Sequence, residues 1–273
     1  MVLLSLIVLA LMTVFSSTQA VFRASVTQAD VLGGGRTVMG LMKNDFESLT
    51  PSFGASNGAV NFCAVTNWYQ YQSNSAPLVQ SLAGSGYLRT NVLEYFFLLT
   101  RQNTTWTGTG YFVDTASTNY LNPLYRFSMS TNAAADPAAL YQAFVNTIYF
   151  AGWTNMSHLA DGVVQLTVRP YDINGRWMTN FYTYYGSNPV QATTNRNAWF
   201  SVPQLGEVGF YLYSNTLPGS VEIQLGLLED RTLQRAQSIS GLAQSNYLAL
   251  QSGKVHLFRQ RLLIRNVDPS AYQ

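Results

Sequence analysis

The sequence predicts an α+β fold in which a long N-terminal hydrophobic/amphipathic helix packs on antiparallel β-sheets. Two observations predict it. No charged side chain precedes Arg23, and after residue 50 short segments rich in β-branched and aromatic residues alternate with turn residues. We therefore divide the chain into an N-terminal membrane-anchoring and amphipathic helix, residues 1–50, and an antiparallel β-rich globular domain, residues 51–273.

The expected helix opens with a strongly apolar run from Met1 to Phe15, in which only Ser5 and Thr13 are polar. A helix over the uncharged residues would be about 33 Å long, close to the roughly 30 Å of a bilayer's hydrocarbon core. Further on, Met39, Met42, Phe46 and Leu49 follow a heptad-like spacing. Thr50-Pro51 should end the helix, and Gly33–Gly35 should kink it or melt one turn.

Two interpretations of this N-terminus compete. In the first, Thr18-Gln19-Ala20 is a signal-peptidase site and the chain is cleaved after Ala20. In the second, a membrane helix continues directly into the folded domain. The second is favoured because no positive charge precedes the apolar run and because a long helical pattern follows it.

The remaining chain reads as strands with turn signals. The clearest hairpin is Gly162–Arg169 returning over Arg176–Tyr185, with its turn at Asp172-Ile173-Asn174-Gly175. Asp136-Pro137 predicts the start of a helix over Ala138–Ile148, and Gly241–Gln251 is a second short helix. The other expected strands are Asn91–Leu99, Thr107–Val113, Leu124–Met129, Val208–Leu212, Val221–Leu228 and Val255–Val267.

Composition excludes several classes of function. The formal net charge is only +2, too balanced for an electrostatic nucleic-acid binder. A single cysteine, Cys63, permits no intrachain disulfide and no multi-cysteine zinc site. Two histidines in the chain argue against a multi-histidine metal centre. The chain is interpreted as a structural subunit, for which we expect no metal site, no cofactor and no catalytic residue.

Several local patterns are tested against that expectation. Gly54-Ala55-Ser56-Asn57-Gly58 matches a nucleophile elbow but lacks the flanking strand and helix that the elbow needs. His158 is expected at a strand entry and His256 on a solvated face. Asp172 with Asn174 resembles a calcium loop but is explained by a hairpin turn. An aromatic sugar-binding platform in the 181–199 region remains open, from Phe181, Tyr182, Tyr184, Tyr185 and Trp199.

These segments together resemble a known family. An uncharged apolar N-terminus running into RTVMGLMKNDFESLTPS is similar to the start of type IV pilin-like proteins. The segments GYFVDTASTNYLNPLYRFSM, HLADGVVQLTVRPYDINGRW and LPGSVEIQLGLLEDRTLQR follow the order seen in the J-type minor pseudopilin of type II secretion systems. The ending VHLFRQRLLIRNVDPSAYQ resembles J homologues of the Verrucomicrobia type.

The resemblance implies a non-enzymatic subunit that polymerises, helix against helix, in the bacterial inner membrane with its globular domain in the periplasm. Its partners would be other pilin-like subunits, inner-membrane lipid and secreted protein substrates. The basic leader ending in glycine and the glutamate shortly after it, both typical of the family, are missing here. The expected membrane and assembly residues are Val2, Leu3, Leu4, Leu6, Ile7, Val8, Leu9, Leu11, Val14, Phe15, Phe22, Met39, Met42 and Phe46.

Two other classes of function stay open. A secreted surface or glycan-binding protein would be released by cleavage after Ala20 and would use its Tyr- and Asn-rich segments for recognition. An extracellular hydrolase would need paired carboxylates or a genuine serine elbow, and no sequence feature selects such a pair.

Overall fold

The computed structural model describes residues 2–53, 59–66, 77–82, 84, 86–116, 121–150, 156–179, 183–185, 188–190, 197–201 and 203–272. Within these ranges the side chains of residues 2–6, 20–24, 26–27, 183–185 and 188–190 lie outside the description.

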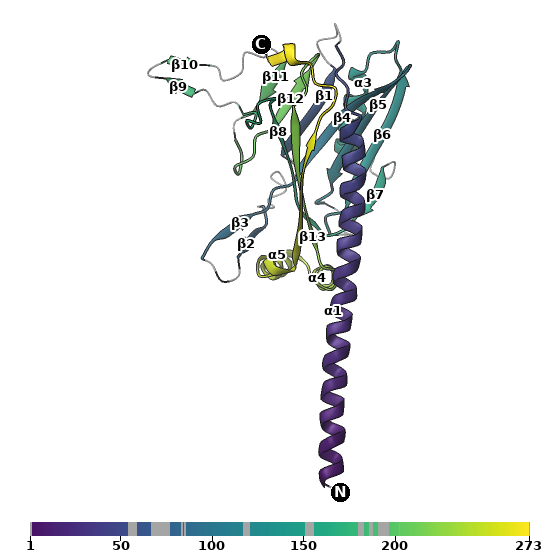
Figure 1. Cartoon of the computed structure of the whole chain (residues 1–273), viewed down its shortest axis with the longest axis vertical. Coiled ribbons are helices and arrows are strands. Elements are labelled where there is room, and N and C mark those ends of the chain that lie inside the picture. The colour runs from purple at the N-terminus through teal and green to yellow at the C-terminus, as the bar shows by residue number, and fades with distance from the viewer. Residues whose placement is uncertain are drawn as a thin grey trace.

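The N-terminal helix α1 (Val2–Glu47) is 46 residues long, about 69 Å at 1.5 Å per residue. Figure 1 shows its first half projecting away from the body and its second half lying against the sheets. The melted turn expected at Gly33–Gly35 is wrong, because helix runs through all three residues. The alternative of a kink stays a prediction. Gly35 instead allows close packing, since a Cβ there would come within 2.2 Å of the Phe258 ring.

The expected fold class is wrong. The chain is mainly antiparallel sheet, and the helices α3 (Ala138–Tyr149), α4 (Asp230–Gln237) and α5 (Gly241–Ala249) are short. Among the described residues no helix combines the length and the apolar character that a membrane span requires. Nor is the start of α1 amphipathic: Ile7, Val8 and Leu9 are consecutive, so they point to different sides of the helix, and all three are exposed.

A seven-stranded antiparallel sheet forms the larger layer, in the order β11-β12-β1-β4-β5-β6-β7. The strands are β1 (Val60–Thr66), β4 (Glu94–Gln102), β5 (Thr105–Val113), β6 (Leu124–Asn132), β7 (Ser157–Ala160), β11 (Ala198–Phe200) and β12 (Phe210–Tyr213). Two further pairs are β2 (Val79–Ser81) with β3 (Leu88–Thr90), and β9 (Thr183–Tyr185) with β10 (Asn188–Val190).

A second antiparallel sheet has the order β14-β13-β8, from β8 (Val163–Tyr171), β13 (Ser220–Leu228) and β14 (Val255–Leu263). The expected hairpin of 162–169 with 176–185 is wrong, because β8 pairs along its length with β13. The turn itself forms, with Asp172 Oδ1 accepting from the N–H groups of Asn174 and Arg176. Beyond it only the bridge from Tyr171 to Trp177 continues the hairpin within the described residues.

The other predicted elements are confirmed with shifted ends. Strands β5, β6 and β13 and helix α3 cover the segments expected for them. Strand β14 ends at Leu263, before the expected Val267, and α5 ends at Ala249, before the expected Gln251. The strand expected over Asn91–Leu99 begins three residues later, at Glu94. The helix expected to stop at Thr50-Pro51 ends at Glu47, close to the proline that excludes further helix.

The main core lies where α1 and the two sheets meet. Val31, Val38, Met42 and Phe46 form the buried stripe of α1, at steps close to the helical repeat. They pack against one face of the seven-stranded sheet and against the inner face of β8, β13 and β14. The opposite face of the larger sheet packs on α3 in a separate core. The main core draws side chains from both sides of residue 50. The expected division of the chain at that residue is not tested by this arrangement and stays a prediction.

Candidate functional site

The first half of α1 carries a run of exposed apolar side chains that we call the apolar segment, Ile7–Phe15. The exposed fractions are 52% for Ile7, 46% for Val8, 70% for Leu9, 64% for Leu11, 70% for Met12, 63% for Val14 and 65% for Phe15. Large contiguous apolar patches are rare on monomers and mark surfaces that contact protein or lipid. The apolar segment is therefore the strongest candidate for a contact surface.

The hydroxyl groups around the apolar segment are satisfied within the helix. Thr13 donates to the Leu9 carbonyl at 2.8 Å, and Ser17 donates to the Thr13 carbonyl at 2.8 Å. Thr18 donates to the Val14 carbonyl at 2.8 Å. A helix whose hydroxyls bond to its own carbonyls can be transferred out of water without stranding a donor, because burying an unpaired hydroxyl is costly.

The predicted membrane and assembly residues fall into three groups. The residues of the apolar segment are exposed, as a contact surface requires. Met39, Met42 and Phe46 are between 0% and 5% exposed and belong to the chain's own core, so they are closed to neighbouring molecules. Val2, Leu3, Leu4, Leu6 and Phe22 have side chains outside the described residues.

A charged cluster fixes the second half of α1 to the larger sheet. Asp45 on α1 accepts hydrogen bonds from Arg126 Nε and Nη2 on β6, each at 2.9 Å. The hydroxyl of Tyr111 on β5 donates to the same carboxylate. Burial, together with the Asp45 carboxylate, raises the pKa of Tyr111, which therefore stays protonated as a donor. Charge-assisted, bidentate bonds of this kind hold both position and orientation.

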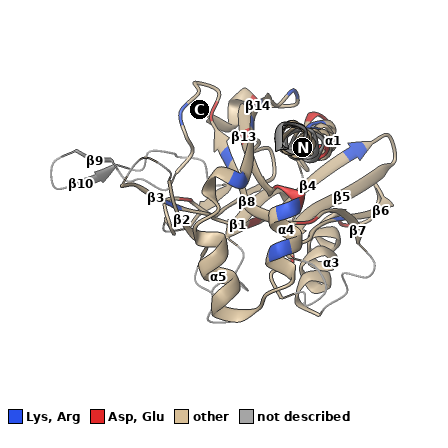
Figure 2. Cartoon of the chain, turned by 90° about the horizontal axis from the view of Figure 1, so that it is seen from below, with Lys and Arg blue, Asp and Glu red and all other residues tan. Residues whose placement is uncertain are grey.

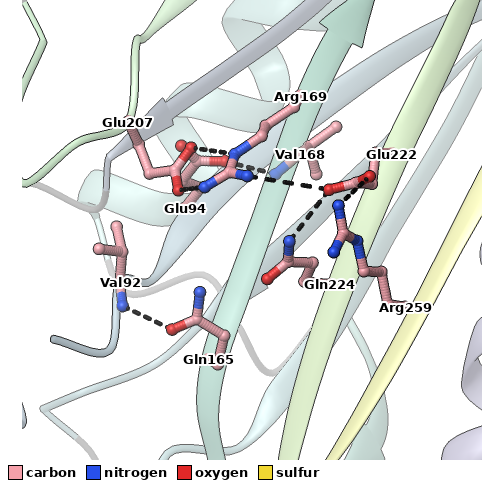
Figure 3. Close-up of polar contacts among 9 residues, drawn as sticks. All are labelled: Val92, Glu94, Gln165, Val168, Arg169, Glu207, Glu222, Gln224 and Arg259. Atoms are coloured by element: carbon pink, nitrogen blue, oxygen red, sulfur yellow. Dashed lines mark hydrogen bonds and ion pairs between the residues drawn. The ribbon is translucent and has the colours of Figure 1, made fainter. Parts of the chain in front are cut away.

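A second polar network crosses the outer face of the smaller sheet (Figure 3). Arg169 on β8 is bidentate to Glu207 and lies 3.8 Å from Glu222 on β13. Glu222 in turn accepts from Arg259 on β14 at 2.7 Å and from Gln224 at 3.0 Å. Acidic and basic side chains thus alternate in the order Glu207, Arg169, Glu222 and Arg259. The two in the middle each lie between two groups of opposite charge.

Glu94, at the start of β4, lies at the buried end of this network and is 1% exposed. Its Oε2 accepts from the Val168 N–H at 2.7 Å. Burial raises the pKa of the Glu94 carboxyl well above its usual value, and the neighbouring Glu207 carboxylate raises it further. The protonated form of Glu94 is therefore favoured beside Glu207, which is held by Arg169.

A carboxyl group with a raised pKa beside a second carboxyl group is a pattern found in acid–base catalysis. Here, however, both Glu207 oxygens bond to Arg169, and one Glu94 oxygen bonds to the backbone of β8. Glu94, Glu207 and Glu222 are 1%, 5% and 6% exposed. Glu94 thus links β4 to β8, Glu207 is held against β8 by Arg169, and Glu222 links β13 to Arg259 on β14.

The network also predicts how stability depends on pH. The pKa of Glu94 is higher in the folded chain than in the unfolded one. At pH values between these two pKa values, the folded chain therefore binds more protons than the unfolded chain. Stability therefore falls as pH rises above about 4.3, the usual glutamate value, toward the raised pKa. Glu94→Gln keeps an acceptor for Val168 and should remove this fall. Urea unfolding between pH 5 and pH 8 measures it.

In that series Glu47→Gln is the matched control, because Glu47 is a partly exposed carboxylate on α1. It should leave the pH dependence of the wild type in place. Equal slopes for Glu94→Gln and the wild type would show that Glu94 is not protonated in the folded chain.

The other residues singled out in the sequence have local roles. His158 lies 2.9 Å from Asp161, and His256 lies 3.4 Å from Glu229. No group of three or more metal-ligating side chains occurs within the described ranges. Gly54–Gly58, Phe181 and Tyr182 lie outside the described residues, as do the side chains of Tyr184 and Tyr185, while Trp199 is 52% exposed.

Sequence reasoning missed both charged clusters. One signal was present: only 10% of residues are charged, yet Glu94, Arg126, Arg169 and Glu222 fall inside β-rich runs. In a chain with so few charges, those placed within strands are strong candidates for buried pairs.

No family model, curated protein or solved structure matches this chain. The resemblance to J-type minor pseudopilins accordingly stays a prediction.

Proposed function

We propose that this chain is a non-enzymatic, pilin-like subunit, similar to the J-type minor pseudopilin, of a type II secretion or type IV pilus-like assembly. The apolar segment of α1 packs against the same segment of neighbouring subunits, and the β-rich body stays outside that contact. The observation that carries the proposal is the exposure of the apolar segment on a helix that projects from the body (Figure 1).

The energetics favour contact between helices. Full burial of one large apolar side chain contributes about 1.5–3 kcal/mol. The seven exposed apolar side chains of the segment would together contribute on the order of 10 kcal/mol. Because the segment is already helical, little backbone entropy is lost when it is buried.

The family motifs support the same proposal through their places in the fold. Residues 110–129 span the end of β5 and most of β6, the strand that binds α1 through Arg126. Residues 158–177 contain β8, and residues 217–235 contain β13 and the start of α4. The motifs therefore include Arg126, which binds α1, and strands whose buried side chains share the main core with α1.

The test is a charged substitution within the apolar segment. Leu11, 64% exposed, should tolerate Leu11→Asp without loss of folding, because it has no partner in the chain's core. Higher-order species trapped by chemical cross-linking of native membranes should be lost. Ser17→Asp adds the same charge at an exposed position beyond the segment and is the matched control.

Unchanged cross-linking of Leu11→Asp would refute the proposal. Inner-membrane placement, which the resemblance implies, is tested in the same experiment by fractionation without detergent. N-terminal sequencing of the isolated protein separates the alternative: a mature chain beginning at Val21 would favour the secreted glycan-binding protein.

A further inference from the structure

Strand β14 is a long, open sheet edge. It is nine residues long, and it pairs only with β13 within the described part of the chain. The opposite edge, β8, is tied to the larger sheet, since Leu166 N–H donates to the Val92 carbonyl and Val92 N–H donates to Gln165. An open edge presents unpaired backbone N–H and C=O groups that can accept another strand.

The side chains of β14 alternate between the core and the solvent. Leu262 joins the main core and Phe258 packs against it, where α1 crosses at Gly35. Leu257, Arg259 and Leu263 are 51%, 64% and 78% exposed, and Arg261 is also exposed. Figure 2 shows β14 beside β13 and α1 when the molecule is seen from below. The exposed row therefore reads apolar, basic, basic, apolar.

The two arginines of this row differ in their partners. Arg259 is paired with Glu222 at 2.7 Å. Arg261 donates to the Ser220 hydroxyl at 3.0 Å, and its guanidinium lies 4.0 Å from the centre of the Tyr171 ring. No carboxylate within the described residues forms an ion pair with Arg261. Arg261 is therefore a cation held in position by Ser220 and Tyr171 and open to an acidic group of a partner.

The two arginines of β14 also indicate which kind of strand can pair with its open edge. Two copies paired edge to edge through β14 would bring arginines opposite arginines, and like charges directly opposite destabilise a strand pair. Arginine on an edge strand thus opposes self-association. An acidic strand would instead form opposite-charge cross-strand pairs with Arg259 and Arg261.

We propose that the open edge of β14 binds an extended, acidic segment of a partner protein by strand addition. The segment would carry two acidic side chains on one face, opposite Arg259 and Arg261, flanked by apolar side chains opposite Leu257 and Leu263. Backbone hydrogen bonds would supply affinity and the alternate side chains specificity. This proposal is independent of the assembly role of α1.

The test uses a fluorescein-labelled peptide, Leu-Thr-Glu-Thr-Glu-Thr-Leu, and fluorescence anisotropy with the full-length chain. We expect saturable binding that Arg261→Glu weakens about tenfold, since it replaces an attractive cross-strand pair with a repulsive one. Arg231→Glu makes the same charge change on the exposed surface of α4 and should leave binding within about twofold.

Two further peptides test the mode of binding on the unaltered chain, so the result does not depend on a variant that folds poorly. A peptide with lysine in place of glutamate should not bind. A peptide methylated on alternate backbone nitrogens should lose binding if strand addition is correct. Absence of binding by the acidic peptide, equal losses for Arg261→Glu and Arg231→Glu, undiminished binding of the methylated peptide, or dimers joined through β14 would each overturn the proposal.

Discussion

Phe46→Ala is expected to lower the free energy of unfolding by about 4 kcal/mol, within the range for deleting a fully buried phenylalanine. Phe46 is 0% exposed and lies in the last turns of α1. Its ring packs edge-on against Phe62 with centroids 5.4 Å apart and stacks on Phe96 at 5.6 Å. These neighbours lie on β1 and β4 at the centre of the sheet, so they cannot move in to fill the cavity.

Phe15→Ala is the matched control, because Phe15 is on the same helix and is 65% exposed. Its stability should stay within about 0.5 kcal/mol of the wild type. Urea unfolding followed by near-ultraviolet circular dichroism measures both variants. In the cross-linking assay Phe15→Ala should give fewer higher-order species than Phe46→Ala. Equal destabilisation by the two substitutions would contradict the division of α1 into a buried half and a contact half.

Asp45→Ala is expected to cost about 3 kcal/mol. Removing one member of a fully buried ion pair costs about 3–5 kcal/mol. The lower end applies because the side chains of Asp45 and Arg126 keep 14% and 22% of their exposure. The substitution also leaves the buried Tyr111 hydroxyl without its acceptor.

Lys43→Ala is the control for that substitution. Lys43 forms an exposed pair with Glu47 at 3.7 Å on the same helix, which should contribute less than about 0.5 kcal/mol. Raising the salt concentration should affect this pair and leave the cost of Asp45→Ala nearly unchanged. A cost below about 1 kcal/mol for Asp45→Ala would show that the cluster does not fix α1 to the sheet.

The sequence predicted elements whose own pattern is strong. A strand-like run after a turn located β13, and Asp136-Pro137 located the start of α3. Strand partners were harder, because pairing depends on residues far apart in the chain. The turn at Asp172 suggested a local hairpin, but β8 pairs with β13, whose centre lies some fifty residues away.

The candidate site was predictable only in part. The exposure of Ile7–Phe15 and the burial of Met39, Met42 and Phe46 were not distinguished in the sequence, since both sets are apolar side chains expected on one helix. What separates them is the sheet that lies beside the second set, and its strands come from residues far along the chain. The Gly33–Gly35 triplet misled for a similar reason, because the use of Gly35 depends on Phe258 from the other end of the chain.

The packing of the first helix against the last strand has a consequence for synthesis. The buried stripe of α1 is made first, whereas β14, which covers part of it, is made last. At about 5–20 residues per second, the roughly 200 residues between them take on the order of ten to forty seconds. During that interval the part of the stripe that β14 covers is exposed, and the nascent chain cannot complete its main core. A nascent chain arrested before Val255 should therefore depend on a chaperone, which makes the C-terminal strand the element that commits this protein to its fold.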